Sequence, residues 1–164
     1  MSKMLPYFSL SKQSEHSESD LGIKRTFADD ILVNVENSAG TDRIGMDKGK
    51  KEWRITMKYD YGFIDCVKGA DGEGLDVYLG PDQEAKKVFV VHQNDPSTGK
   101  YDEDKVMLGF ANGKEAKEAY LDHYNSPDFF GSMTIMDFDE FKKIVQKGEK
   151  GKVTWNIKPK RKKK

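Results

Sequence analysis

The chain has 164 residues, of which 36% are hydrophobic and 34% are charged, and its 28 basic and 28 acidic residues balance. This length predicts one domain with its own core, and the aromatic content of 11% excludes a wholly disordered chain. No apolar run is long enough for a transmembrane helix, and the N-terminus lacks the apolar core of a signal peptide. The single cysteine, Cys66, excludes an internal disulfide. We therefore expect a cytoplasmic protein without membrane contact, in which Cys66 is a buried or half-buried structural thiol.

The balance of charge hides an asymmetry along the chain. Six of the 28 basic residues lie in 158–164, which leaves 22 basic against 28 acidic side chains in 1–157. The body is therefore mildly acidic, unlike most nucleic-acid-binding domains. The tail is expected to be disordered, and it serves either as a weak contact to nucleic acid or as a solubilising end.

The predicted elements begin after a flexible N-terminal segment, residues 1–29, in which Ser, Glu and Lys dominate. Alternating and β-branched runs predict strands at 31–35, 52–58, 61–67, 75–79, 88–92, 105–110, 132–136 and, at an edge, 152–157. Residues 40–51 are typical of a hairpin loop, and 94–99 of a tight turn. Helical spacing appears at 113–124 and again after Asp137, a candidate N-cap. Strands followed by helices predict an α+β domain over 30–157, before the basic tail 158–164.

The first candidate site is an acidic turn. Asp71, Glu73 and Asp76 lie at positions i, i+2 and i+5, and Gly72 and Gly74 allow the tight backbone that would bring them together. Clustered carboxylates repel one another unless a cation lies between them, and oxygen ligands suit hard cations such as Mg²⁺ or Mn²⁺. The alternative is a solvated acidic turn. Because of this repulsion, replacing Asp76 by Asn is expected to leave the metal-free protein equally or more stable.

A second acidic cluster precedes an apolar run. Asp102, Glu103 and Asp104 are followed directly by Lys105. In an extended segment Glu103 and Lys105 would share one face, and Asp104 would lie on the other. A carboxylate beside an ammonium suits a metal ion with a bound phosphate, whereas an exposed ion pair is the simpler alternative.

These motifs together resemble the signature of family I soluble inorganic pyrophosphatases. Tyr61–Ile64 reads Tyr-Gly-Phe-Ile, and 71–77 reads Asp-Gly-Glu-Gly-Leu-Asp-Val where that family has Asp-Gly-Asp-Pro-(Leu/Val)-Asp-Val. The pyrophosphatase-like domain of phage and prophage polyvalent proteins is more similar still, through Asp76–Pro81, Val88–Gly99 and Asp102–Phe110. That pattern also matches Glu36, Asn37, Gly40, Arg43, Gly49, Trp53 and Met57. The resemblance covers about residues 30–147.

The resemblance implies a five-stranded OB-like antiparallel barrel with flanking C-terminal helices and an acidic mouth. The implied metal ligands are Asp71, Glu73, Asp76, Glu103 and Asp102, with Asp95 as another candidate. The implied substrate-binding residues are Glu36, Arg43, Tyr61, Lys105 and Tyr124, with Lys50 or Arg54 at a second basic position. The implied catalytic residues are Glu73, Asp76 and Lys105. Glu73 occupies the position of the proton acceptor.

The resemblance further implies Mg²⁺-dependent hydrolysis of a phosphoanhydride, above all inorganic pyrophosphate, by a phage-type accessory protein in a bacterial host's cytoplasm. A homo-oligomer is compatible with this assignment. Three departures stand out: Glu73 replaces Asp, Gly74 replaces Pro, and Asn125 stands where the family has a lysine. The alternative is therefore a protein of the same fold that has lost turnover and binds a nucleotide, a host protein or nucleic acid.

Two further residue sets are interpreted as structural. His92 lies at the end of an apolar strand, where a structural role is favoured over metal ligation. Tyr61 and Tyr78 belong to a series of strand aromatics that suits either core packing or a stacking platform for bases. Core packing is favoured because no basic surface accompanies them.

Overall fold

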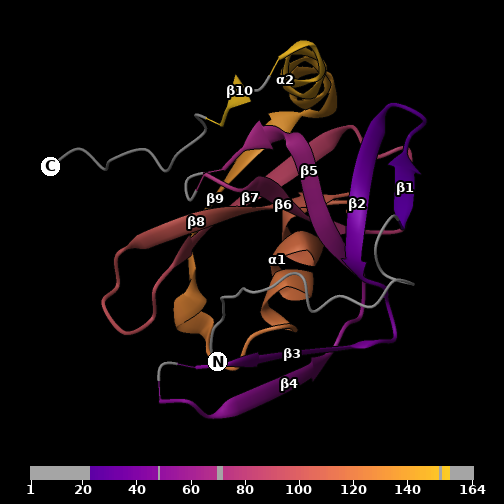
Figure 1. Cartoon of the computed structure of the whole chain (residues 1–164). Helices are drawn as coiled ribbons and strands as arrows, with labels where there is room; N and C mark the ends of the chain where they lie inside the picture. The colour runs from indigo at the N-terminus through magenta and orange to yellow at the C-terminus, as the bar shows by residue number, and fades with distance from the viewer. Residues whose placement is uncertain (1–22, 48, 70–71, 152, 156–164) are drawn as a thin grey trace, which may run out of the picture.

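The computed structural model describes residues 23–47, 49–69, 72–151 and 153–155 (Figure 1). Asp71 and the basic tail 158–164 lie outside the described residues, as does most of the N-terminal segment. The strands are β1 (Lys24–Phe27), β2 (Ile31–Asn37), β3 (Asp42–Met46), β4 (Glu52–Thr56), β5 (Asp60–Lys68), β6 (Gly74–Leu79), β7 (Lys87–Asn94), β8 (Tyr101–Leu108), β9 (Phe130–Asp137) and β10 (Val153–Thr154). The helices are α1 (Gly113–Leu121), the short η2 (Pro127–Phe129) and α2 (Phe138–Lys150). Neither α1 nor α2 has the length and apolar character that crossing a membrane requires.

Most of the described strands form one mixed sheet in the order β1-β2-β5-β6-β8-β7-β9, and β10 pairs with β5. The predicted α+β class is confirmed. The sheet differs from the predicted five-stranded antiparallel barrel, because β6 and β8 run parallel and no pairing among the described residues joins β1 to β9. The parallel pair arises because β7 lies beyond β8, so the β7–β8 hairpin returns β8 alongside β6.

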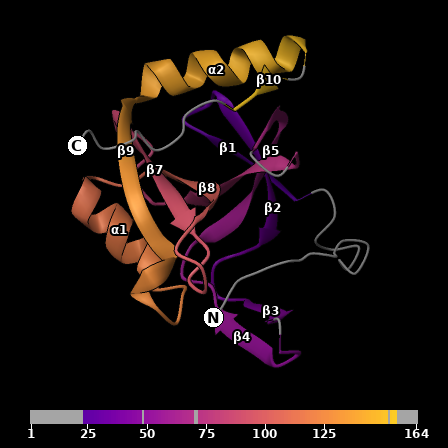
Figure 2. The same cartoon turned by 90° about the vertical axis from the view of Figure 1, so that its left-hand side faces the viewer.

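Two apolar cores lie on opposite sides of the sheet. The α2-side core contains Phe27, Val33, Val67, Leu75, Val90, Phe141, Val145 and Trp155 among its buried residues. The α1-side core contains Met57, Tyr61, Tyr78, Phe89, Met107, Ala116, Tyr120 and Phe129. Figure 1 shows α2 above the sheet and α1 below it, and Figure 2 shows the two helices at opposite ends of β9. Each helix therefore covers one face.

The second helix follows the predicted pattern. Asp137 takes the extended N-cap conformation, although its side chain makes no capping hydrogen bond. Phe138, Phe141 and Val145 recur at helical spacing and pack against the sheet. Lys147 and Lys150 lie in the last turn, where positive charge favours the helix dipole.

Strands β3 and β4 form a separate two-stranded hairpin below the sheet (Figure 1). Residues 42–46 are thus a strand, not part of the loop predicted for 40–51. Gly45 lies opposite Trp53, and a Cβ at Gly45 would come within 2.4 Å of the Trp53 ring. The absence of a side chain lets the indole lie across the strand. The same glycine lowers strand propensity, which explains the incorrect prediction.

The ordered body starts before residue 30. Strand β1 lies inside the range predicted to be flexible, because Phe27 is buried and its ring packs 5.8 Å from that of Phe138. At the other end of the chain, β10 agrees with the short strand predicted near 152–157 and runs parallel to β5. Cys66 is half-buried and its thiol donates to the Val145 carbonyl, as expected of a structural thiol.

Candidate active site

The centre of the candidate site is the ammonium group of Lys105, which is buried on the α1 side of the sheet. Its Nζ atom donates to Asp76 Oδ2 at 2.7 Å and to Tyr61 Oη at 2.8 Å. It also forms an ion pair with Glu103 Oε2 at 3.2 Å. The carboxylates of Asp76 and Glu103 therefore converge on one cation, and the side chain of each is 22% exposed.

The register of the sheet explains this convergence. Asp76 of β6 lies opposite Lys105 of β8 in the parallel pair, and Tyr61 of β5 lies opposite Tyr78 of β6. Glu103 and Lys105 share a face because side chains alternate along a strand. Asp104 lies on the opposite face, where Trp155 donates to it. The alternation predicted from the sequence is confirmed.

The surroundings of Lys105 keep it charged. Burial by itself would lower the pKa of Lys105, but attraction to Asp76 and Glu103 outweighs it and raises the pKa well above the ordinary value. The ammonium therefore persists throughout the neutral range. It balances two carboxylates that would otherwise repel one another.

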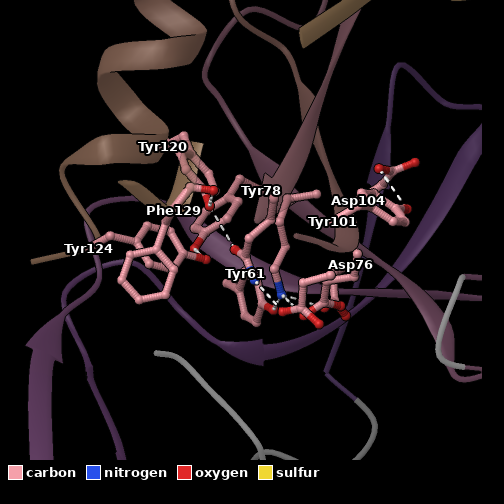
Figure 3. Close-up of polar contacts among 12 residues, drawn as sticks. Tyr61, Asp76, Tyr78, Tyr101, Asp104, Tyr120, Tyr124 and Phe129 are labelled. Atoms are coloured by element: carbon pink, nitrogen blue, oxygen red, sulfur yellow. Dashed lines mark hydrogen bonds and ion pairs between the residues drawn. The ribbon is translucent and has the colours of Figure 1, made fainter. Parts of the chain in front are cut away.

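A layer of aromatic rings supports the site (Figure 3). The Tyr61 and Tyr78 ring centroids are 4.7 Å apart, and those of Tyr120 and Tyr124 are stacked at 4.4 Å. The Tyr78 and Tyr124 hydroxyls lie 3.1 Å apart. Burial raises the pKa of each of these four phenols, so they stay neutral. These rings pack in the core, as the sequence favoured, and they do not form an exposed stacking platform.

Arg43 brings a second cation to this layer from the β3–β4 hairpin. Its guanidinium carbon lies 4.5 Å from the centroid of the Tyr61 ring and 5.5 Å from that of Trp53. The planar guanidinium is thus held between aromatic faces. Burial disfavours the Arg43 charge, but electrostatic interactions with Tyr61 above all, then with Tyr78, Tyr124 and Glu36, raise its pKa above the ordinary value. Glu36 and Arg43, both predicted to bind substrate, therefore interact electrostatically.

The other predicted carboxylates that the structure describes lie on turns or near the start of β8. Glu73 is exposed, on a turn closed by a hydrogen bond from Gly69 N to Glu73 O at 2.7 Å. Asp71 belongs to the same turn in sequence but lies outside the described residues. Asp102 is exposed and accepts from Gln93 at 3.3 Å. Asp95 accepts from Ser97 within the β7–β8 turn.

The two remaining basic candidates lie away from Arg43. Arg54 is on the outer face of the hairpin, paired with Asp42 at 3.0 Å, and its side chain is 55% exposed. Lys50 lies in the exposed β3–β4 turn with a positive φ of 63°. The inward-facing position of the hairpin is occupied by Arg43 because inward and outward residues alternate.

The carboxylates of the site are possible donors to a divalent metal ion. Within the described residues, no group of three or more His, Cys, Asp or Glu side chains is arranged to hold one. Mg²⁺, however, is usually bound by one or two carboxylates together with substrate oxygens and water. Asp76 and Glu103 supply two such carboxylates, and both converge on the position of the Lys105 ammonium. The residues present therefore fit Mg²⁺ bound together with a phosphate substrate.

Sequence analysis missed a buried network behind the site. The Asp104 carboxylate accepts from His92 Nδ1 at 2.7 Å, Tyr101 Oη at 3.0 Å and Trp155 Nε1 at 2.7 Å. His92 Nε2 lies 2.6 Å from the Thr134 hydroxyl. His92 is thus a buried structural residue, as interpreted. Alternation along the strand had placed Asp104 opposite Glu103 and Lys105, but the acidic run gave no sign that this opposite face is buried.

Comparison with known proteins identified a family and similar solved structures, one of which is described here. A family profile described as inorganic pyrophosphatase matches residues 14–146. The crystal structure of an inorganic pyrophosphatase from Neisseria gonorrhoeae is similar, with 18% sequence identity and a TM-score of 0.43 over 81% of this chain and 98% of that one. Comparison with curated proteins found no match. On the strength of the profile, which spans most of the sequence, the chain belongs to the inorganic pyrophosphatase family.

Proposed function

We propose that this protein hydrolyses inorganic pyrophosphate in a Mg²⁺-dependent reaction at the Asp76–Glu103–Lys105 cluster. The observation that carries the proposal is the convergence of Asp76, Glu103 and Tyr61 on the Lys105 ammonium. The arrangement joins two carboxylates, which suit a hard cation, to a buried ammonium, which suits a phosphate. Membership of the pyrophosphatase family supports the same chemistry.

Asp76 and Glu103 are the proposed metal ligands. Asp71, Glu73 and Asp102 are proposed to complete the ligand set as substrate enters. When bound, Mg²⁺ or Mn²⁺ would neutralise phosphate oxygens and acidify the attacking water. Glu73 is the proposed acceptor of the water's proton. Glu73 is exposed and directly precedes β6, the strand that carries Asp76.

Lys105 and Arg43 are the proposed phosphate-binding cations. Lys105 Nζ already has Asp76, Tyr61 and Glu103 as partners, so binding a phosphate requires it to release one of them. Asp76 and Glu103 would hold the metal ion, and Lys105 would then be available to bind a phosphate oxygen. Tyr61, Tyr124 and Glu36 are proposed to position the cations and the substrate. The planar guanidinium of Arg43 suits two phosphate oxygens at once.

A phosphate-release assay tests the proposal. The wild-type protein is incubated with Mg²⁺ and pyrophosphate, a nucleoside triphosphate or a nucleotide bearing two separate phosphoanhydride groups. We expect release from pyrophosphate, with loss of at least about 100-fold in Asp76→Asn. Equal rates in the wild type and Asp76→Asn would overturn the assignment of the site.

A binding protein without turnover is the second candidate. Three sequence features favour it: Glu73 in place of the family's Asp, the loss of the family lysine at Asn125 and the six basic residues of 158–164. Nucleic-acid binding carried by this segment would be weak and would fall steeply with salt. A salt titration of DNA binding compares the full chain with one that ends at Ile157. Unchanged affinity after truncation would assign binding to the acidic body. The proposed hydrolase would act as a phage-type accessory protein, an assignment that rests on the motifs of residues 76–110.

A further inference from the structure

We propose that Trp155 is a positioning residue for the active site. It links the end of β5, which leads into the acidic turn, to β8, which carries Glu103 and Lys105. The inference rests on the proposed function for its effect on turnover. Its structural part is that Trp155 holds the acidic turn after β5 and the Glu103–Lys105 segment of β8 in place, and this part can be tested without catalysis.

The backbone of Trp155 fixes the start of the acidic turn. Its N–H donates to the Lys68 carbonyl at 2.7 Å, which continues the parallel pairing of β10 with β5. Lys68 is the last residue of β5, and the next residue, Gly69, closes the turn through its hydrogen bond to the Glu73 carbonyl. A shift of Lys68 would therefore move the turn that carries the acidic motif.

The side chain of Trp155 fixes β8. Its indole Nε1–H donates to Asp104 Oδ2 at 2.7 Å, and both residues are at most 3% exposed. Asp104 lies between Glu103 and Lys105, whose side chains point to the other face. A strand cannot shift or rotate at one residue without moving its neighbours, so holding Asp104 also holds the two site residues.

Strands β5 and β8 do not pair with each other in the described sheet, because β6 lies between them. Trp155 bridges them over the α2-side core, in which Leu75 of β6 also lies. Its ring meets that of Phe141 edge-on, with centroids 6.0 Å apart. This indole is therefore fixed by packing on one side and by the Asp104 carboxylate on the other.

The alternative is that Trp155 only fills the core. A phenylalanine at position 155 would then fill the core nearly as well. Any loss of Mg²⁺ affinity in that variant would come only from the missing hydrogen bond to Asp104, and removing another donor to Asp104 would cause the same loss. The structure offers a matched test of this alternative. Tyr101 also donates to Asp104, to Oδ1 at 3.0 Å, but it comes from the start of β8 itself, whereas Trp155 also donates to Lys68 at the end of β5.

The experiment compares Trp155→Phe with Tyr101→Phe in the full chain. Each change removes one donor to the same carboxylate and keeps an aromatic ring. We expect Trp155→Phe to weaken Mg²⁺ binding by about 10-fold or more in calorimetry, the usual scale for residues that support metal ligands. It should shift the amide NMR signals of Gly74 and Glu103. Pyrophosphate turnover should fall at low Mg²⁺ and recover at saturating Mg²⁺. Tyr101→Phe should stay within about twofold of the wild type.

Two results would overturn the proposal: unchanged Mg²⁺ affinity and amide signals in Trp155→Phe, or equal changes in both variants. If Trp155→Phe does not fold, hydrogen exchange of the Trp155 indole N–H in the wild type decides. Binding effects are reciprocal, so exchange should slow as Mg²⁺ is added. Trp53 serves as the control indole. An unchanged Trp155 exchange rate would refute the link. A protein that responds in these ways but fails to cleave pyrophosphate would disprove only the proposed function.

Discussion

The Nζ atom of Lys105 lies 2.7 Å from Oδ2 of Asp76, because the parallel register of β6 and β8 places these residues opposite one another. This contact reverses one expectation from the sequence. Asp76 belongs to a cluster of carboxylates, but its nearest charged partner is a buried cation. Removing the Asp76 charge therefore takes a partner from Lys105 instead of relieving repulsion.

We predict that Asp76→Asn destabilises the metal-free protein. The loss should be about 1–3 kcal/mol, because a charged hydrogen bond disappears while Glu103 and Tyr61 still contact Lys105. Chemical denaturation in the presence of a chelator measures it. Asp102→Asn, an exposed change in the neighbouring acidic run, is the control and should stay within about 0.5 kcal/mol of the wild type. If Asp76→Asn is as stable as the wild type, repulsion among the carboxylates outweighs the contact between Asp76 and Lys105, as the sequence alone suggested.

We predict that Lys105→Met binds Mg²⁺ more tightly than the wild type while losing turnover. Removing the ammonium removes the cation that competes for Asp76 and Glu103, so affinity should rise at least about fivefold. Without the proposed phosphate-binding group, turnover should fall at least about 100-fold. The metal-free variant should be destabilised, and Mg²⁺ should restore part of the loss.

The readouts are calorimetry with Mg²⁺ and thermal unfolding with and without the ion. Lys87→Met is the matched control, because Lys87 forms an exposed pair with Asp137 in which the side chains are 56% and 65% exposed. Lys87→Met should match the wild type in Mg²⁺ affinity and in thermal stability with and without Mg²⁺. Weaker Mg²⁺ binding by Lys105→Met would argue that the ammonium does not share the metal position.

We predict that Arg43→Lys weakens pyrophosphate binding although it keeps the charge. A lysine cannot reproduce the planar contact with the Tyr61 and Trp53 rings, so KM should rise by about 3- to 30-fold. Hydrogen exchange of the β3–β4 amides should also quicken, because Arg43 joins the hairpin to the sheet. Arg54→Lys changes the same residue type on the outer face of the same hairpin and should have neither effect. Equal KM changes in both variants would contradict the inward assignment.

We predict that His123 makes the fold sensitive to acid. Burial lowers the pKa of His123, and its Nε2 accepts from Lys58 N at 3.0 Å while Nδ1 donates to the Ala119 carbonyl at 2.7 Å. The folded state thus binds this proton less readily than the unfolded state does. Its contribution to stability is complete above the ordinary pKa of about 6.5 and is lost as pH falls below it, by up to about 1.4 kcal/mol per pH unit.

Unfolding free energies at pH 7.5 and pH 5 test this dependence. The wild type should lose more stability across this interval than His123→Gln, which does not titrate. His92→Gln is a second comparison, and it should retain the part of the acid sensitivity that comes from His123. Identical losses in the wild type and His123→Gln would assign the acid sensitivity to other groups.

The local pattern of the sequence determined much of the fold. Alternating apolar residues predicted β2, β5, β6, β7 and β9 closely, and helical spacing predicted α1 and α2. It also determined that Glu103 and Lys105 share a face, since alternation is a property of any strand. Where local signals conflicted, prediction failed. Gly45 obscured β3, and the polar composition near residue 29 obscured β1, which is held by burial of Phe27.

What the sequence could not determine depends on contacts between distant segments. The parallel register of β6 and β8 places Asp76 beside Lys105, although 28 residues lie between these two positions along the chain. The hairpin brings Arg43 onto Tyr61, and the C-terminal Trp155 reaches Asp104. No local propensity encodes these pairings, because each depends on which strands become neighbours and on which face of the sheet is covered. The sequence by itself therefore determined which residues are candidates for the chemistry and which face of their strand they occupy. The tertiary structure decided which charges are partners, because only the packed sheet brings them within hydrogen-bonding distance.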